Sequence, residues 1–550
     1  MHAMLCSTIA LVALHCSALA AQGSAGDDGR VWVEATQYED FHVVTPEKPS
    51  TLMQNAASAF CRYWKQAARQ TITASTVNDG KINVWLGAQI ITEEMVKHDE
   101  LDGLSPEGCL IRTYTPGPRY TAKGARKQLL IAGTTDQATL HGVYTFFAEV
   151  FGARWLAPGV AKVTPAAFSM RNVEVRADPA FAFRDTGLFS QWRGAGAEEF
   201  RRGLRLTEAF TPPPPGMDAL TALLRPAAGG QANAAEYGSE AGADSIANTI
   251  AALVRAGQTA DPEIRARRER AAWPPGTNTW SLNALDWLTP VAAAECAARD
   301  ASGGSPAASV LFTANRVAGR LAELFPDAPP RIHVLLPPGL RRPPKTLHPV
   351  ENVIVQISAA DLDFARPMED PANAAFADDL RGWGKLGGRL WVLDQAVNRR
   401  DPRLPFPTLH TLPSNVLFCA QNGVSGVYAL GGAAGTDAPA DMAEMRAYLW
   451  AQVLWNPDIP FDEVLREYCE LYYGPAGGAV LECIGMEETA MKASGRPLRT
   501  DDNGAWLDAA AARRIGEKLE AALALPNLPP EAKPRVAAVL ASVKHGAEAH

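Results

Sequence analysis

The first 21 residues contain no Lys, Arg, Asp or Glu. This stretch is apolar from Leu5 to Leu14 and ends with small residues at Ala18 and Ala20, the A-x-A pattern of a cleaved export signal. Its apolar part is too short to span a bilayer. We therefore expect residues 1–21 to be a signal peptide and the protein to be secreted or periplasmic.

The chain also lacks an excess of basic residues. Its formal net charge is −8, which argues against a nucleic-acid or anionic-membrane surface, because such surfaces need clustered Lys and Arg. No later segment reaches the length of a membrane span. Hydrophobic content of 47% with 20% charged residues is typical of a globular protein, so we expect two or three packed domains in 550 residues. The oligomeric state stays open.

Most signatures of cofactor, metal and nucleophile chemistry are missing. There is no G-x-S-x-G, H-E-x-x-H or C-x-x-C, and Gly133-Thr134-Thr135 lacks the spacing and the Lys of a phosphate loop. We expect no cofactor and no metal. Six cysteines follow the leading stretch at wide spacing, which favours buried free thiols over a disulfide framework, with one disulfide as the alternative.

Strand and helix signals alternate over residues 28–176. Lys81–Gly87 and Gln128–Thr134 are typical of buried strands, and Leu52–Gln70 and Thr135–Gly152 have apolar residues at helical spacing. Thr135 and Asp136 are the candidate caps of the second helix. This alternation predicts a small mixed sheet covered by helices.

Beyond Ala177-Asp178-Pro179-Ala180, short apolar strands recur and each ends in polar residues. Near-continuous apolar strands separated by helices such as 309–325 and 376–386 predict a parallel sheet, and their number suggests a (β/α)8 barrel over residues 177–457. The Ala-, Gly- and Pro-rich residues 205–275 give poor strand signals where two barrel strands belong, so an irregular barrel is the alternative. The expected strands are Phe181–Asp185, Thr279–Asn283, Arg331–Leu336, Asn352–Ser358, Arg389–Asp394, Asn415–Cys419 and Gly426–Leu430.

From residue 442 onward the pattern is helical. Helices are expected at 442–455, 461–473, 477–494 and 508–523, and from 530 to the end. We therefore expect a helical region over residues 458–550, and the whole chain to be of the α/β class.

Two sets of residues carry a resemblance to known families. The run from Leu129 through His141-Gly142-Val143-Tyr144 to Gly152-Ala153-Arg154-Trp155-Leu156-Ala157-Pro158-Gly159 resembles the N-terminal domain of α-glucuronidases. Further on, the chain resembles the domain-of-unknown-function 4838 group, which includes glycoside hydrolase family 163. The matching pieces include Arg184-Asp185-Thr186-Gly187, Ser281-Leu282-Asn283 with Asp286, Gly423-Val424-Ser425-Gly426-Val427 and Leu454-Trp455-Asn456-Pro457.

The resemblance implies a glycoside hydrolase, whose chemistry needs an acid and usually a second carboxylate. In a parallel barrel these groups lie where the strands end. Asp286 and Asp394 are the candidate catalytic residues, with helix capping as the alternative for each. Arg184, Asp185 and Asn283 are candidate sugar ligands, and an Arg–Asp pair that fixes the first strand is the alternative for Arg184 and Asp185.

Tryptophans near strand ends are candidate platforms for the C–H faces of sugars. They are Trp192, Trp280, Trp287 and Trp391. We expect an exported hydrolase of O-glycosyl bonds whose substrate is a glycan with N-acetylhexosamine or uronic acid. The alternative is a non-catalytic glycan-binding relative that kept the barrel, because Asn283-Ala284-Leu285-Asp286 replaces the polar pair that relatives carry directly after this strand.

Overall fold

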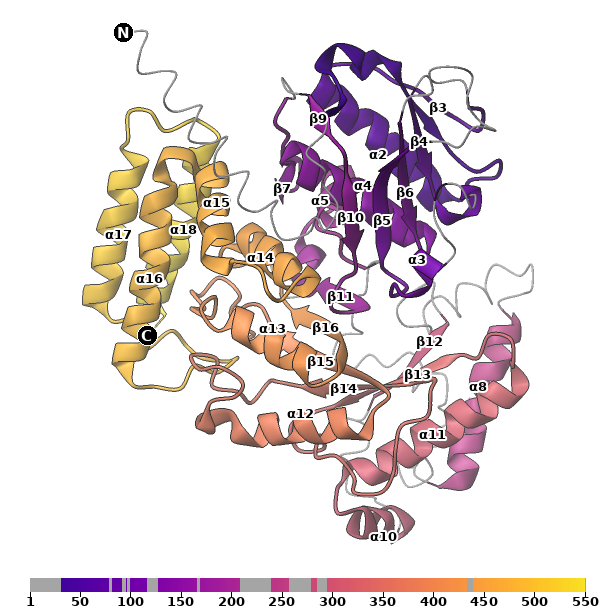
Figure 1. The fold of residues 1–550 in the computed structure, drawn as a ribbon. Coiled ribbons are helices and arrows are strands. Elements are labelled where there is room, and N and C mark those ends of the chain that lie inside the picture. Colours follow the sequence, from indigo (N-terminus) through magenta and orange to yellow (C-terminus); the bar gives the residue numbers. More distant parts are fainter. Residues whose placement is uncertain are drawn as a thin grey trace. The chain divides into compact units, whose positions relative to one another are not determined.

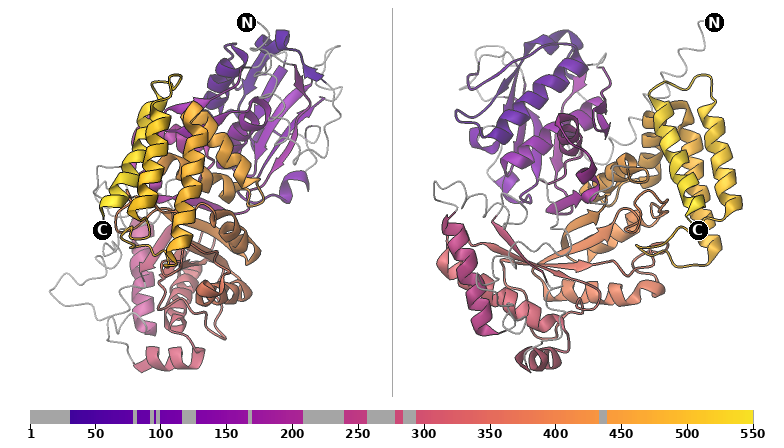
Figure 2. Two further views of the ribbon diagram at one scale, coloured as in Figure 1. Left: turned by 90° about the vertical axis from the view of Figure 1, so that its left-hand side faces the viewer. Right: turned by 180° about the vertical axis from the view of Figure 1, so that it is seen from behind.

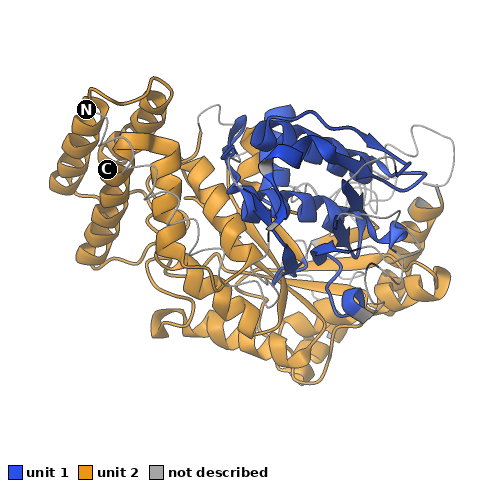
Figure 3. Ribbon diagram, turned by 45° about the horizontal axis from the view of Figure 1, so that its top comes forward, with its two compact units in different colours: residues 1–182, 194–205 blue, residues 183–193, 206–550 orange. Residues whose placement is uncertain are grey.

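The computed structural model describes residues 31–78, 82–91, 95, 99–115, 127–165, 169–207, 239–256, 278–283, 294–432 and 439–549. The predicted signal peptide lies outside these residues. The chain divides into two compact units, shown in blue and orange in Figure 3. Unit 1 comprises Met1–Ala182 and Gly194–Arg205, and unit 2 comprises Phe183–Arg193 and Leu206–His550. No helix among the described residues is long and apolar enough to cross a membrane.

A six-stranded mixed sheet forms the centre of unit 1, as the sequence predicts (Figure 1). The strand order is β10-β5-β6-β4-β2-β3, and β5 runs antiparallel to both of its neighbours while β6, β4, β2 and β3 are parallel. The strands are β2 (Phe41–Val44), β3 (Ala74–Ser75), β4 (Ile82–Leu86), β5 (Cys109–Tyr114), β6 (Gln128–Gly133) and β10 (Glu174–Ala177).

Two capped helices, α2 (Thr51–Ala68) and α4 (Asp136–Phe151), supply the aromatic core of unit 1. The side chains of Ser50 and Thr135 accept hydrogen bonds from first-turn amides, so the predicted Thr135 cap is confirmed. The Phe60 and Phe146 rings stack between the helices at 5.5 Å. The remaining elements are β1 (Val31–Val33) paired with β9 (Met170–Arg171), β7 (Arg154–Ala157) paired with β8 (Val160–Lys162), α3 (Asp99–Asp102), α5 (Ala195–Gly203), η2 (Ala35–Asp40) and η3 (Ala88–Ile90).

Glu199 fastens α5 to the rest of unit 1. Its carboxylate accepts hydrogen bonds from the hydroxyls of Tyr63 and Tyr144, the latter at 2.8 Å, and pairs with Arg62 at 2.5 Å. The Tyr63 hydroxyl in turn accepts a hydrogen bond from Nε1 of Trp155 at 2.7 Å. Since charge-assisted hydrogen bonds are the strong ones, this cluster holds a segment that returns to unit 1 after β11 has contributed to unit 2.

A curled sheet of six parallel strands forms the centre of unit 2 (Figure 1). Its order is β11-β16-β15-β14-β13-β12, so β12 to β16 neighbour one another in chain order and β11 joins β16, as in a barrel. The full eight-stranded barrel is not confirmed. Between β11 and β12, the described residues form η5 (Gly187–Gln191), α5 and α8 (Glu240–Ala256). The strands are β11 (Phe183–Thr186), β12 (Thr279–Asn283), β13 (Arg331–Leu336), β14 (Val353–Ser358), β15 (Arg389–Gln395) and β16 (Val424–Leu430).

Helices cover one face of this sheet. Helix α11 lies against β13 and β14, α13 against β16, and α14 against β11. We call this side the helix-covered face and the opposite side the inner face. The elements are α10 (Ala294–Gly303), α11 (Ala307–Leu324), α12 (Ala374–Leu386), α13 (Leu412–Gln421), α14 (Ala443–Trp455), η5 (Gly187–Gln191) and η7 (Pro371–Asn373).

One predicted strand is wrong. Residues 415–419 belong to helix α13, with Pro413 in its first turn and the left-handed Gly423 beyond its end. A short apolar run does not distinguish a strand from a buried helical turn. Tertiary contacts decide here, because Asn415 accepts a hydrogen bond from the amide of Met368 at 2.8 Å within the core.

The C-terminal region is helical, as predicted. Figure 2 shows α16, α17 and α18 running side by side in yellow tones, in agreement with their contacts. A buried ion pair at the start of α14 contacts this bundle: Arg446 pairs with Asp441 at 2.8 Å, and the hydroxyl of Ser542, from the last helix of the bundle, donates to the same carboxylate at 2.8 Å. The elements are α15 (Phe461–Tyr473), η8 (Gly474–Ala476), α16 (Gly477–Ser494), α17 (Ala509–Leu523) and α18 (Ala532–Glu548).

Candidate functional site

The two faces of the unit 2 sheet differ in chemistry. Successive side chains of a strand point to opposite faces. Phe183, Ile354, Trp391 and Tyr428 form one buried cluster on the inner face. On the other face, the Arg184 guanidinium lies 5.1 Å from the centre of the Trp455 ring of α14. A residue's position in its strand therefore tells which face its side chain joins.

An aromatic stack lines the inner face. The rings of Phe183 and Trp391 lie 4.2 Å apart and are tilted by only 8°. They come from β11 and β15, and Gly426 of β16 stands in register between them. A side chain at that glycine would meet the Trp391 ring at 2.6 Å. Trp391, a predicted sugar platform, is 9% exposed and has Phe183 against one ring face.

A polar row continues from this stack across the inner face. The hydroxyl of Ser281 is 3.0 Å from Nδ1 of His333, and Nε2 of the same ring is 3.0 Å from Oε1 of Gln356. Burial lowers the pKa of His333 to about 3, so the imidazole is neutral at physiological pH. In the sequence, each member of this row is one polar residue within a separate strand, placed before the strand end, so only the register of the strands shows that the three lie side by side.

Asp185 lies on the inner face, at the carboxyl end of β11. It is fully buried and accepts a hydrogen bond from the amide of Thr186 at 2.6 Å. Tyr428 stands in register with it on β16, and a side chain at Gly187 would meet the Tyr428 hydroxyl at 2.8 Å. Its sequence neighbour Arg184 is equally buried but belongs to the helix-covered face, so the two predicted sugar ligands point to opposite sides of the sheet.

Asp394 occupies the corresponding end of β15 but on the helix-covered face. It follows Trp391 by three residues, which gives it the opposite orientation, and it interacts electrostatically with Cys419 of α13. Burial raises the pKa of Asp394 to about 7, against the smaller opposing effect of a hydrogen bond from the amide of Gln395. Such a pKa suits a general acid. Asp185 and Asp394, however, do not face each other.

Of the other predicted site residues, three are described by the structure and two are not. Trp280 is fully buried, with Nε1 3.5 Å from Asn278 Oδ1, and Trp192 is half-buried after η5 with its ring edge-to-face to Phe189. Asn283 is the last residue of β12. The predicted catalytic Asp286 and the predicted platform Trp287 lie outside the described residues.

Two further aspartates at the end of β14 are engaged in structural contacts. Asp361 pairs with the buried Arg341, which also contacts Asp379 at 3.0 Å. Asp363 accepts a hydrogen bond from the amide of Leu498 at 2.9 Å. Across the described ranges, no group of three or more His, Cys, Asp or Glu side chains is arranged to hold a metal ion.

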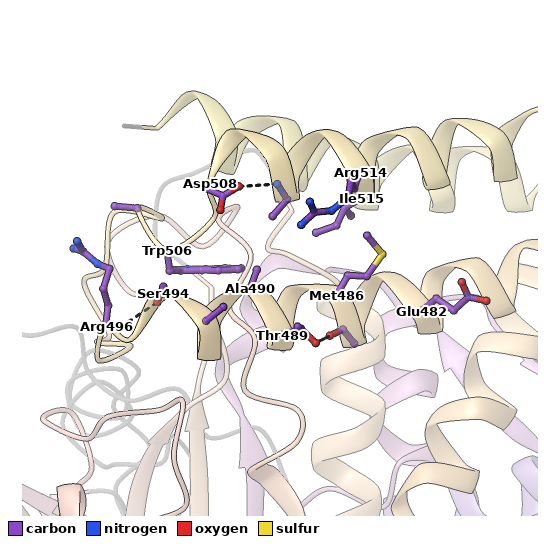
Figure 4. A pocket seen from close by; sticks show the side chains of 14 residues that line it. Glu482, Met486, Thr489, Ala490, Ser494, Arg496, Trp506, Asp508, Arg514 and Ile515 are labelled. Atoms are coloured by element: carbon purple, nitrogen blue, oxygen red, sulfur yellow. Dashed lines mark hydrogen bonds between the residues drawn. The ribbon is translucent and has the colours of Figure 1, made fainter.

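A surface cavity of about 670 Å³ lies between α16 and α17 (Figure 4). Its wall includes Met486, Ser494 and Arg496 on one side and Trp506 and Arg514 on the other. The cavity belongs to the helical bundle and none of the predicted site residues lines it.

Comparisons with known proteins agree with this architecture. Residues 263–484 match a family model described as a domain of unknown function, DUF4838. No curated protein matches the chain in sequence. A solved structure of a family GH115 4-O-methyl-α-glucuronidase with specificity for decorated arabinogalactans is similar with a TM-score of 0.52 and 12% identity; the match covers 92% of this chain and 71% of that one.

Two other solved structures match with lower TM-scores. A GH138 enzyme that targets pectin rhamnogalacturonan II has a TM-score of 0.43 and 9% identity, covering 92% of this chain and 85% of that one. Streptomyces plicatus N-acetyl-β-hexosaminidase, in complex with Thio-NAglucal, has a TM-score of 0.40 and 13% identity, covering 85% and 95%. The structural neighbours are thus glycoside hydrolases, and the chain is similar in fold to the first of them.

Proposed function

We propose that this protein is an exported glycoside hydrolase that cleaves O-glycosyl bonds of glycans at the carboxyl edge of the unit 2 sheet. The observation that carries the proposal is the six-stranded parallel sheet, whose strand order places β11 and β12 to β16 as in a barrel. In such folds the active site lies at the carboxyl ends of the strands. The similarity to a glucuronidase fold over 92% of the chain supports it.

Asp286 is the proposed acid, because it comes three residues after the end of β12 in the sequence. Asp185 is the proposed second carboxylate on the inner face; because it is fully buried, its proposed role is to support the developing positive charge electrostatically. The raised pKa of Asp394 would suit a general acid, but its place on the helix-covered face favours a structural role. The proposed substrate is a glycan that contains N-acetylhexosamine or uronic acid. Membership of glycoside hydrolase family 163, which the sequence resemblance suggests, is part of this proposal.

The second candidate function is glycan binding without turnover. One observation favours it: the two strand carboxylates of unit 2, Asp185 and Asp394, lie on opposite faces and do not act on one bond together. A glycosidase pair stands about 5–10 Å apart on either side of the scissile bond. Catalysis therefore depends on Asp286.

The experiment is turnover by the purified protein of a panel of complex N-glycans, uronic-acid oligosaccharides and aryl glycosides. We expect release of reducing sugar that Asp286→Asn lowers by roughly 10²-fold or more, since general acid catalysis contributes about that much. Asp378→Asn, which changes an exposed α12 carboxylate, is the matched control and keeps full activity. Binding without turnover supports the second function. If the protein shows no binding and no turnover, both functions are overturned.

A further inference from the structure

The connector between α16 and α17, residues 495–508, is docked on the loops that follow β14 and β15. The amide of Leu498 donates to Asp363 at 2.9 Å, and the amide of Phe364 donates to the Leu498 carbonyl at 2.9 Å. The amide of Arg399 donates to the Thr500 carbonyl at 2.6 Å. These loops begin where the strands end, so a piece of the helical tail lies at the carboxyl edge of the sheet (Figure 1).

The connector is fixed in this position. Leu498 and Thr500 are buried, and the side-chain amide of Asn398 donates to the Asp502 carbonyl at 2.7 Å. Arg499, between the two buried residues, is exposed, and its guanidinium donates to the carbonyl of Asp361. Because both flanking side chains are anchored, the Arg499 side chain is presented from a rigid base.

Three exposed arginines come together on these two hydrogen-bonded loops. Arg399 and Arg400 follow β15, and Arg499 lies in the connector that bonds to them. We call them the arginine edge. Two acidic residues follow Arg499 in the connector, the exposed Asp501 and the half-buried Asp502, so three positive side chains stand beside two negative ones.

Two of the neighbouring carboxylates pair with other cations. Asp361 pairs with Arg341, and Asp401 pairs with Arg403 at 2.6 Å and with His545 at 2.7 Å. Within the part of the chain that the structure describes, Arg399 and Arg400 have no carboxylate within ion-pair distance. Their charges are therefore available to a ligand.

We propose that the α16–α17 connector forms a wall of the glycan cleft and that the arginine edge binds an anionic substituent of the sugar. This rests on the proposed function and deepens it. A guanidinium presents its N–H groups in a fork that matches a carboxylate or a sulfate oxygen pair. The ligand is a uronate or a sulfated glycan, and the shared chemistry is a fixed oxyanion on a neutral ring.

The test measures binding of the full chain to three polymers at about 0.15 M salt, where exposed charges more than a Debye length apart are screened. Polygalacturonate carries carboxylates, dextran sulfate carries sulfates, and dextran is neutral. The triple variant Arg399→Gln, Arg400→Gln, Arg499→Gln is compared with the wild type. A control triple, Arg320→Gln, Arg466→Gln, Arg513→Gln, removes the same charge from exposed positions on α11, α15 and α17.

We expect the wild type to bind one anionic polymer better than dextran, and the arginine-edge triple to lose roughly tenfold or more of that affinity, because hydrogen bonds to charged groups contribute at least this much. The control triple keeps it. The preferred polymer identifies carboxylate or sulfate. Equal losses in both triples, or none in the first, overturn the inference.

Failure of the inference and failure of the proposed function give different results. A protein that binds or cleaves only neutral glycans refutes the arginine edge and leaves the glycosidase proposal standing. A protein that neither binds nor cleaves any glycan of the panel refutes both. Thermal melting of each triple shows that the fold is kept, since all six positions are exposed.

Discussion

Phe183 and Trp391 stack in parallel at 4.2 Å although a whole strand separates them in the sheet. The strand between contributes Gly426 at that register, so the two rings meet over a position without a side chain. Offset aromatic pairs stabilise beyond the area that they bury. The stack connects β11, the first strand of the unit 2 sheet in chain order, to β15, the fifth.

Replacing Gly426 by alanine tests this packing. The added methyl would stand 2.6 Å from the Trp391 ring and 2.9 Å from Cβ of Phe183, so one of the rings must move. We expect a loss of about 1–3 kcal/mol in the free energy of unfolding, as for other overpacked cores. Gly319→Ala in α11 is the control, because open space surrounds that position and alanine is the better helix former. Denaturant unfolding measures both, and a Gly426 variant as stable as the control contradicts the packing.

Asp394 gives stability a pH dependence with a defined sign. Burial raises its pKa to about 7 in the folded protein, so the folded state holds a proton that the unfolded chain releases at about pH 4. Its contribution to stability is complete below the unfolded pKa and is lost as the pH rises through about 7. Relative to Asp394→Asn, the wild type should lose on the order of 1–3 kcal/mol between about pH 5 and pH 8.

Denaturant melts across this pH range measure the difference. The exposed Asp378→Asn serves as the control and should run parallel to the wild type. Parallel curves for the wild type and Asp394→Asn would mean that Asp394 titrates like an exposed carboxylate.

Arg446 and Asp441 form a buried ion pair at the start of α14, where Ser542 of the tail helix α18 donates a hydrogen bond to Asp441. Arg446 also donates to the carbonyl of Phe406 at 2.6 Å, and its side chain is 1% exposed. Arg446→Met leaves a buried carboxylate without its cation, which costs about 3–5 kcal/mol. Arg320→Met breaks an exposed pair with Glu323 and should cost less than about 1 kcal/mol. Similar thermal shifts for both variants would show that the Arg446 pair contributes little.

Among the predicted sugar platforms that the structure describes, Trp192 is the partly exposed one. It follows η5 at the carboxyl end of β11, and Gln191 beside it accepts a hydrogen bond from the amide of Ala440 at 3.1 Å, which fixes this turn. We expect Trp192→Ala to weaken glycan binding by about 3- to 10-fold, which corresponds to one aromatic contact. Trp192→Phe should keep most of the affinity. Isothermal titration calorimetry with a glycan that the wild type binds measures the affinity of each variant. An unchanged affinity of Trp192→Ala would exclude Trp192 as a sugar platform.

Much of the architecture could be predicted from the sequence, because apolar periodicity reports burial directly. The tail helices, the six strands of the unit 2 sheet and strands β4 and β6 of unit 1 fall where their patterns place them. Strands β2, β3, β5 and β10 of unit 1 were not predicted, and residues 415–419 form a helix in place of the predicted strand. That segment shows the limit: a short run of buried residues suits either a strand or a helical turn, and only contacts with neighbours such as Met368 decide.

The candidate site is harder to predict from the sequence than the fold. Arg184, Asp185 and Asp394 all lie near strand ends, so this position alone does not distinguish them. Strand alternation already separates them, since Asp394 stands three residues from Trp391 and Asp185 two residues from Phe183. The docking of residues 495–508 on the strand ends could not be predicted, because those contacts join residues more than 90 positions apart in the chain.

The most direct test of glycan recognition at the carboxyl edge is the crystal structure of the protein with a glycan that it binds. We predict a sugar at the carboxyl ends of β11 to β16, with an oxygen within about 3.5 Å of a side chain from the loops that follow those strands, the outer limit of a hydrogen bond. A sugar bound instead in the α16–α17 cavity, or on unit 1, would contradict the account.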